Sequence, residues 1–113
     1  KIIKLMNRNY EVKKVLKAVL RLRKIVPNAM IWNHLMVGFP HETWIDFLKT
    51  VRIVKYFDYS FIIRYSDRKG TRSYHFQKKN SKLMLNLKYL LLNFHFYLFF
   101  LYKIICSIFK RNH

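Results

Sequence analysis

The spacing of apolar residues predicts two amphipathic helices in the first part of the chain. Residues 10–26 and 43–56 each place apolar side chains mostly three or four positions apart, which is the period of one helix face. Asn9 is expected to cap the first helix and Thr43 the second. Because Asp46 follows Thr43 by three positions, the second helix is expected to begin with a capping box.

Two apolar runs of strand length alternate with these helices. Residues 29–37 form a nearly continuous apolar run, with Asn33 and His34 in its middle, and residues 57–65 form the second run. Continuous apolar runs are typical of strands buried on both faces of a parallel sheet. The order helix–strand–helix–strand, with short connections, predicts an α/β fold with a right-handed crossover between the strands.

The pattern changes in the C-terminal third of the chain. Residues 83–109 are apolar on nearly every side and contain no acidic residue, which predicts a long helix. Lys88 and Lys103 enclose a block of 14 residues, shorter than the roughly 20 that a bilayer-spanning helix needs. Small folds bury too little surface to surround such a helix, so we expect it to pack poorly. The chain thus divides into a domain at 1–75 and a tail at 76–113.

The charge of the chain is strongly positive, at a formal +18. Residues 1–75 contribute +11 from nine Lys, seven Arg and five acids, and residues 76–113 contribute +7 from six Lys and one Arg. Such a balance favours polyanionic partners, either nucleic acid or anionic lipid. A bias toward adenine- and thymine-rich codons explains the same lysines as solvated surface residues, and both interpretations stay open.

The metal-ligating residues are few. Cys106 is the only cysteine, so neither an intrachain disulfide nor a cluster held by several cysteines can form within the chain. In its apolar surroundings Cys106 is expected to act as a small hydrophobic residue. The five histidines show no metal-site spacing. The sequence therefore predicts no metal site and no catalytic residue.

Four segments in a fixed order carry a family resemblance. They are "MNRNY" (6–10), "VPNAMIWNHLMVGFPHETWIDFLKT" (26–50), "YFDYSF" (56–61) and "YSDRKGTRS" (65–73). Together they resemble the second half of the radical S-adenosylmethionine domain of the methylthiotransferases. The start and the last loop are most similar to the tRNA 2-methylthio-N6-isopentenyladenosine synthases. The branches that act on threonylcarbamoyladenosine and on a ribosomal protein are near neighbours.

The resemblance implies a fragment of a partial (β/α) barrel, followed here by the apolar C-terminal helix. Intact members of the family bind a 4Fe-4S cluster and S-adenosylmethionine, and they cleave the sulfonium to a 5′-deoxyadenosyl radical. They add a methylthio group to adenosine 37 in the anticodon stem-loop of tRNA. The resemblance therefore implies a cytoplasmic transferase of tRNA modification.

The resemblance also implies cofactor-binding residues on the S-adenosylmethionine side of the barrel, namely Gly38, Phe39, Pro40, Glu42 and Arg68. Ligands of parallel α/β folds lie at the C-terminal ends of strands, where this turn and the loop with Arg68 are expected. Arg68 suits a carboxylate or a phosphate. The structural alternatives are that Gly38 and Pro40 only shape the turn and that Glu42 stabilises the start of the next helix.

The chain departs from the family in several places. The C-x-x-x-C-x-x-C motif that holds the cluster lies upstream of the matched part and is not in this sequence. His41 stands where the family has Gly, and Lys69 where it has Pro. The tail replaces a downstream acidic helix and an RNA-binding β-barrel. We therefore expect a fragment of a tRNA methylthiotransferase that is inactive alone and binds no cofactor. If the gene is split, the missing remainder is its partner.

Two other interpretations explain the tail or the charge. One is a small basic membrane-associated protein, anchored by residues 83–109 and facing anionic lipid with its Lys and Arg side chains. The other is a non-catalytic RNA-binding remnant. The abrupt start of the tail after "KKNSK" also fits translation past a frameshift.

Overall fold

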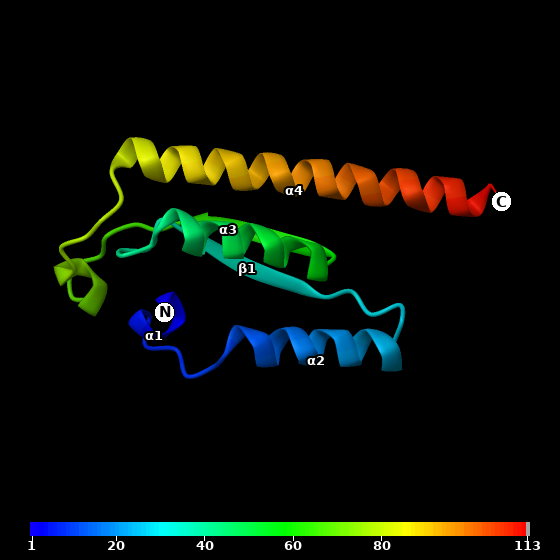
Figure 1. The fold of residues 1–113 in the computed structure, drawn as a ribbon, viewed down its shortest axis with the longest axis horizontal. Coiled ribbons are helices and arrows are strands. Elements are labelled where there is room, and N and C mark those ends of the chain that lie inside the picture. The colour runs from blue at the N-terminus through cyan, green and yellow to red at the C-terminus, as the bar shows by residue number, and fades with distance from the viewer. Residues whose placement is uncertain (113) are drawn as a thin grey trace.

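The computed structural model describes residues 1–112 as a mixture of helices and a small sheet (Figure 1). The elements are, in chain order, α1 (Ile2–Leu5), α2 (Val12–Ile25), β1 (Trp32–Val37), α3 (Trp44–Ile53), the 3₁₀ helix η1 (Val54–Tyr56), β2 (Tyr59–Arg64), the 3₁₀ helix η2 (Arg72–His75) and α4 (Lys82–Arg111). In Figure 1, α4 forms one layer, the sheet and α3 lie in the middle, and α2 lies on the far side.

The two strands pair in parallel, as predicted. The register runs from Trp32 opposite Tyr59 to Val37 opposite Arg64, and α3 with η1 forms the connection between the strands. This confirms the α/β order of the first 75 residues. Two strands do not make a barrel, so the partial barrel implied by the resemblance stays a prediction.

The N-terminal caps of the helices differ in how far they follow the sequence pattern. The capping box of α3 is confirmed, because the Asp46 N–H donates to Thr43 Oγ1 at 3.2 Å and the Thr43 N–H donates to Asp46 Oδ2 at 3.0 Å. The expected cap of α2 at Asn9 is wrong. The helix begins at Val12, where its apolar face begins, and Glu11 occupies the cap position in an extended conformation without a side-chain cap bond.

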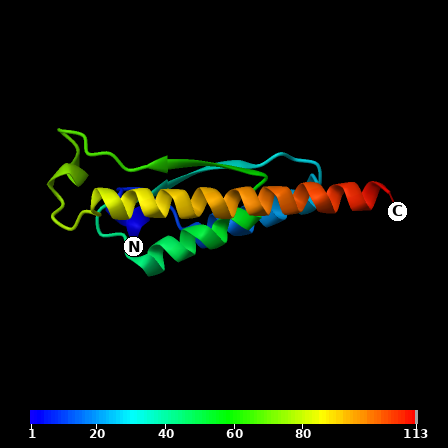
Figure 2. The same cartoon turned by 90° about the horizontal axis from the view of Figure 1, so that it is seen from above.

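The core lies on one face of the sheet, between the strands, α3 and α4. Figure 2 shows α4 running along the strands and over α3. The buried cluster combines residues from all of these elements: Leu35, Val37, Phe47, Val54, Leu92 and Phe96. Two of these six come from α4, so the expectation that the tail packs poorly is wrong for the part of α4 that bears them. That part has one inward side, even though its sequence is apolar nearly all round.

The second half of α4 is different. It continues past the end of the sheet toward the C-terminus (Figure 1), and its large apolar side chains are mostly exposed. By length and composition alone, α4 is the one described helix that is long and apolar enough to cross a membrane. The predicted long helix is therefore confirmed, and the residues that it buries against the α/β part lie in its N-terminal half.

Candidate functional site

The turn that follows β1 is the candidate site, because four of the five predicted residues lie in it. Gly38 follows the last residue of β1 and has a φ of +78°, a left-handed conformation that glycine adopts without steric cost. His41 also has a positive φ, of +67°. Glycine adopts such a conformation more readily than histidine does. The turn then leads through Glu42 into the cap of α3.

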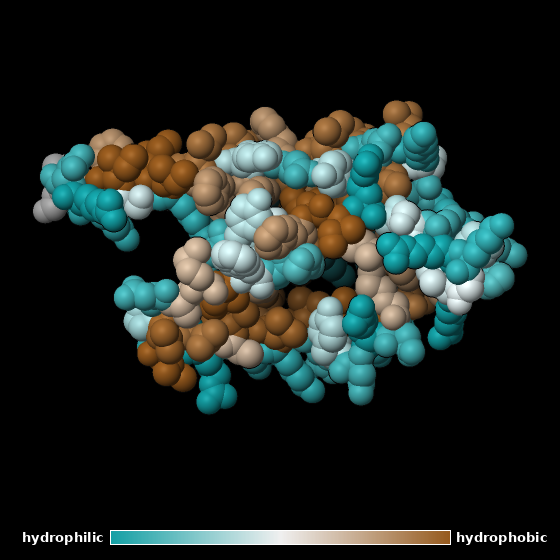
Figure 3. Space-filling model, turned by 180° about the vertical axis from the view of Figure 1, so that it is seen from behind, coloured by the Kyte–Doolittle hydropathy of each residue, from teal (hydrophilic) through white to brown (hydrophobic). Residues whose placement is uncertain are grey.

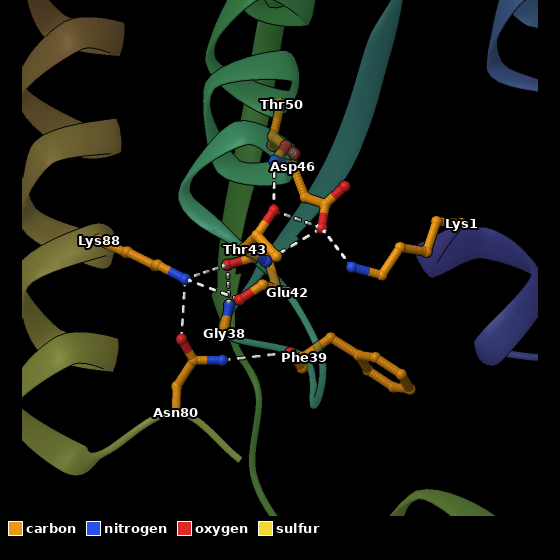
Figure 4. Close-up of polar contacts among 9 residues, drawn as sticks. All are labelled: Lys1, Gly38, Phe39, Glu42, Thr43, Asp46, Thr50, Asn80 and Lys88. Carbon is orange, nitrogen blue, oxygen red and sulfur yellow. Dashed lines mark hydrogen bonds and ion pairs between the residues drawn. The ribbon is translucent and has the colours of Figure 1, made fainter. Parts of the chain in front are cut away.

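Glu42 is the centre of a buried polar network in this turn (Figure 4). Its Oε1 accepts a hydrogen bond from the Gly38 N–H at 3.1 Å and pairs with Lys88 Nζ at 3.0 Å. Lys88 is 1% exposed and Glu42 is 9% exposed. Lys88 also donates to Asn80 Oδ1 at 2.8 Å and lies over the Trp44 ring, 5.3 Å from its centroid. A charge buried so completely is stable only with partners of this kind.

The same network ties the turn to the segment that leads into α4. The Asn80 side-chain amide donates to the Phe39 carbonyl oxygen at 3.2 Å, and the His41 N–H donates to the Lys78 carbonyl oxygen at 2.7 Å. Sequence reasoning missed Lys88 and Asn80 as members of the site. The signal was present for Lys88, because a lysine within an apolar helix needs an acidic partner, and Glu42 lies in the turn between β1 and α3.

Gly38 is closely approached, but by the protein itself. A Cβ atom added at Gly38 would overlap Cδ1 of Leu85, which is the fourth residue of α4. The packing of α4 against the turn therefore explains why position 38 requires glycine. In this conformation α4 occupies the space over the Gly38 backbone that a ligand would require.

Phe39 and Pro40 are interior residues. The Phe39 ring meets Tyr65 and Phe76 edge to face, with centroid distances of 5.3 and 6.2 Å. Pro40 is fully buried. The Phe39 ring packs the turn against residues that follow β2, and the burial of Phe39 and Pro40 favours a structural role for both.

Arg68 lies apart from the other predicted residues. It is exposed in the loop after β2, at the same edge of the sheet because the strands are parallel. Within residues 1–112, no hydrogen bond or ion pair joins its guanidinium to another side chain. Its carbonyl oxygen accepts from the N–H and the hydroxyl of Thr71, which closes the loop. Gly70, in the same loop, has a φ of +85°.

Asp67, the residue before Arg68, uses both carboxylate oxygens in hydrogen bonds. Asp67 accepts hydrogen bonds from Lys79 Nζ and the Tyr65 hydroxyl, both at 2.8 Å. The hydrogen bond from Lys79 is the main reason that the pKa of Asp67 lies below its ordinary range. Asp67 thus stays ionised and links the β2 loop to the segment before α4.

The open space beside the turn is small. A hollow of about 180 Å³ is lined by His41, Glu42, Thr43, Lys78, Lys79 and Asn80. Ligand pockets usually measure roughly 300–1,000 Å³. The turn therefore does not fit S-adenosylmethionine while α4 covers it. Residues 1–112 also contain no group of three or more side chains arranged to hold a metal ion or cluster.

Comparison with known proteins identifies relatives of this chain. No protein-family model matches the chain. A tRNA-2-methylthio-N(6)-dimethylallyladenosine synthase from Syntrophomonas wolfei is 47% identical over 75 residues, which is 65% of this chain. Synthases of the same name from Thermosipho melanesiensis and Clostridium botulinum are 39% and 41% identical over 78% and 67% of the chain.

The chain is related to these synthases. The finding confirms the methylthiotransferase resemblance expected from the sequence. The chain spans only 17–21% of the length of these synthases. The match to the Thermosipho synthase covers 78% of the chain, more than residues 1–75 can hold, so it includes part of the tail.

Proposed function

We propose that this chain is one segment of a tRNA methylthiotransferase and supplies the second half of a radical S-adenosylmethionine domain. The observation that carries this proposal is the 39–47% identity to three tRNA-2-methylthio-N(6)-dimethylallyladenosine synthases. The parallel pair of strands and its crossover helix support it, since that order of elements was expected from the resemblance. Its substrate would be the anticodon stem-loop of tRNA, in the cytoplasm.

The cluster chemistry of such an enzyme has to come from residues outside this chain. A cysteine-ligated 4Fe-4S cluster needs several thiolates, and Cys106 is the only cysteine present. When bound, the cluster and S-adenosylmethionine supply the radical that starts methylthiolation in the family. We therefore propose that this chain is inactive alone and contributes structure to a site that another polypeptide or segment completes.

The role of the turn in that site follows from its contacts. In the intact family, Gly38, Phe39, Pro40, Glu42 and Arg68 correspond to the edge that faces S-adenosylmethionine. For the cofactor to reach Gly38 here, α4 would have to leave the turn and break the ion pair between Lys88 and Glu42. We propose that these residues support the strand end in this chain, and that α4 holds them.

Complementation tests the proposal. Cells that lack the synthase would express this chain alone, the remaining upstream and downstream parts of the Syntrophomonas synthase alone, or both, and mass spectrometry of digested tRNA would detect 2-methylthio nucleosides. We expect the modification only when both parts are present. Modification by this chain alone would contradict its inactivity. A matched control replaces this chain with the corresponding segment of the Syntrophomonas synthase, which shows whether the enzyme works in two pieces.

A further inference from the structure

The charged residues of α4 are placed differently from those of an ordinary surface helix. Between the lysines at its ends, the helix has two charged residues, Lys88 and Lys103, and both face the protein. Lys88 pairs with Glu42, and Lys103 Nζ donates to the Phe57 carbonyl oxygen at 2.8 Å. An ordinary amphipathic helix turns its charges to water and its apolar side to the core. Here both charged side chains face inward, beside the core residues Leu92 and Phe96, and the exposed side of the helix is apolar.

The outward side of α4 is a continuous apolar stripe. Six residues spaced three or four positions apart lie on it, with 51–64% of each exposed: Leu90, Phe94, Tyr97, Leu101, Ile105 and Ile108. We call these six residues the outer stripe. It extends over about 27 Å at 1.5 Å per residue. Figure 3 shows hydrophobic side chains along the α4 edge of the molecule. A contiguous exposed patch of this size marks an interaction surface.

Cations flank both ends of the outer stripe. Lys78 and Lys82 precede its first residue, and Lys110 and Arg111 follow its last, whereas the nearby Lys79 pairs with Asp67. Residues 76–113 contain no acidic residue. An apolar stripe between basic clusters complements a bilayer surface with anionic headgroups, since the side chains enter the acyl boundary and the cations attract the lipid charge.

We propose that α4 lies in the plane of an anionic membrane surface, with the outer stripe in the boundary between headgroups and acyl chains. The α/β part then stays on the aqueous side, joined to α4 through Lys88 and Lys103. This inference does not depend on the proposed tRNA function. It fits the interpretation of the chain as a basic membrane-associated protein, and it places α4 along the membrane instead of across it.

The charges of the chain argue against two other arrangements. A second copy packed stripe to stripe would bring the basic ends of two helices together, with no acid in residues 76–113 to pair them and +18 on each chain. A spanning helix would carry Lys88 and Lys103 into hydrocarbon and remove them from Glu42 and the Phe57 carbonyl. Charged side chains at that depth are costly.

Vesicle flotation of the purified full chain tests the proposal. The probes are vesicles of phosphatidylcholine alone and vesicles that also contain phosphatidylglycerol. We expect the chain to float with the anionic vesicles, to bind the neutral ones more weakly, and to lose affinity as salt is raised. Absence of binding to anionic vesicles, or equal binding to both kinds at every salt concentration, would overturn the proposal.

Paired variants locate the binding surface. Leu90→Ser with Leu101→Ser removes two exposed side chains of the outer stripe, and we expect binding to weaken by about tenfold or more. The matched control, Ile25→Ser with Met30→Ser, removes two side chains that are 75% and 70% exposed but lie off α4. We expect the control to bind like the unmodified chain. Equal loss in both pairs would overturn the proposal, and circular dichroism checks that both pairs are folded.

Two further outcomes separate the alternatives. If the stripe variant turns a dimer into a monomer while the unmodified chain binds no vesicles, the outer stripe is a contact between copies and the proposal fails. Protease added outside sealed vesicles should still cleave at Lys110 and Arg111 in all bound molecules. Protection of that end would mean that α4 spans the bilayer, which would also overturn the in-plane arrangement.

Discussion

The two halves of α4 have similar apolar sequences but contrasting environments. The first half includes Lys88, Leu92 and Phe96, all buried against β1, β2 and α3. The second half exposes most of its isoleucines, leucines and aromatic residues, and Lys103 attaches it to the end of η1. Lys88, the charged residue in the interior of the first half, is among its most deeply buried residues. Hydrophobicity alone therefore does not decide which side of this helix faces the protein.

The difference shows that complementary partners select the inward face. Lys88 is inside because Glu42 and Asn80 offer acceptors at 3.0 and 2.8 Å. Beyond Lys103, α4 continues past the end of the sheet (Figure 1), and its large apolar side chains are mostly exposed. The first half of α4 thus belongs to the α/β fold, whereas the second half offers a surface to another partner.

The largest effect is expected from Lys88→Met. This change keeps much of the side-chain volume but leaves Glu42 buried without its cation, so the free energy of unfolding should fall by roughly 3–5 kcal/mol. Urea denaturation measures it. Lys103→Met is the matched control, because its partner is a neutral carbonyl, and it should cost clearly less. Equal effects at the two lysines would contradict the difference between the halves of α4.

A slightly smaller effect is expected from Leu92→Ala. Leu92 is fully buried in the core, so the cavity should lower the free energy of unfolding by about 2–4 kcal/mol. Leu101→Ala, the same substitution on the outer stripe, should change it by less than about 0.5 kcal/mol in detergent-free buffer. Comparable losses would mean that the second half of α4 is packed after all.

The fold was predictable from sequence where its signals are local. Periodicity and cap residues indicated β1, α3 and β2, and the box of Thr43 with Asp46 followed from residues three positions apart. The packing of α4 was not predictable in this way. A helix that is apolar on every side has no periodicity that selects an inward face, and Lys88 meets Glu42 across 46 positions of sequence.

The candidate site was predictable in position but not in its contacts. Gly38, Phe39, Pro40 and Glu42 do lie together in the turn, because they are adjacent in sequence. The neighbour of Gly38 could not be inferred, since Leu85 belongs to a part of the chain outside the residues that carry the resemblance. Whether these residues face a cofactor in an assembled enzyme stays a prediction.

Acid should weaken the start of α3. Burial is the strongest single influence on Asp46 and raises its pKa, but hydrogen bonds from Thr43 and the ion pair with Lys1 together lower that pKa from 3.8 to about 2. Because the pKa of Asp46 is lower in the folded protein than in the unfolded chain, its ionised form stabilises the protein at pH values above the unfolded pKa. This stabilisation is lost as the pH falls from about 4 to 2. Because Lys1 is half exposed, we expect a loss of about 1 kcal/mol.

Urea denaturation at several pH values measures this dependence. Asp46→Asn should make it shallower without removing it, because the pKa of Asp58 is also lowered. Burial again opposes ionisation most strongly there, and hydrogen bonds from the Ile31 N–H and Arg23 outweigh it. An unchanged slope in the Asp46→Asn protein would show that the capping box does not contribute to acid sensitivity.

The smallest effect, and an opposite one, is expected from His41→Gly. Glycine adopts the φ of +67° without steric cost, so the protein should gain up to about 1 kcal/mol, reduced by the greater freedom of the unfolded chain. Lost contact between His41 and Phe76, whose rings are 5.4 Å apart, also reduces the gain. Thermal unfolding measures it, with His75→Gly as a control that should destabilise η2.

The most direct test of the account is a double-mutant cycle between Glu42 and Lys88. The free energy of unfolding would be measured for the unmodified chain, Glu42→Gln, Lys88→Met and the double variant. If α4 is held to the turn by this buried pair, the double variant should be more stable than the sum of the single changes predicts, by roughly 2–3 kcal/mol. Strictly additive losses would show that the two side chains do not interact and that α4 does not cover the turn.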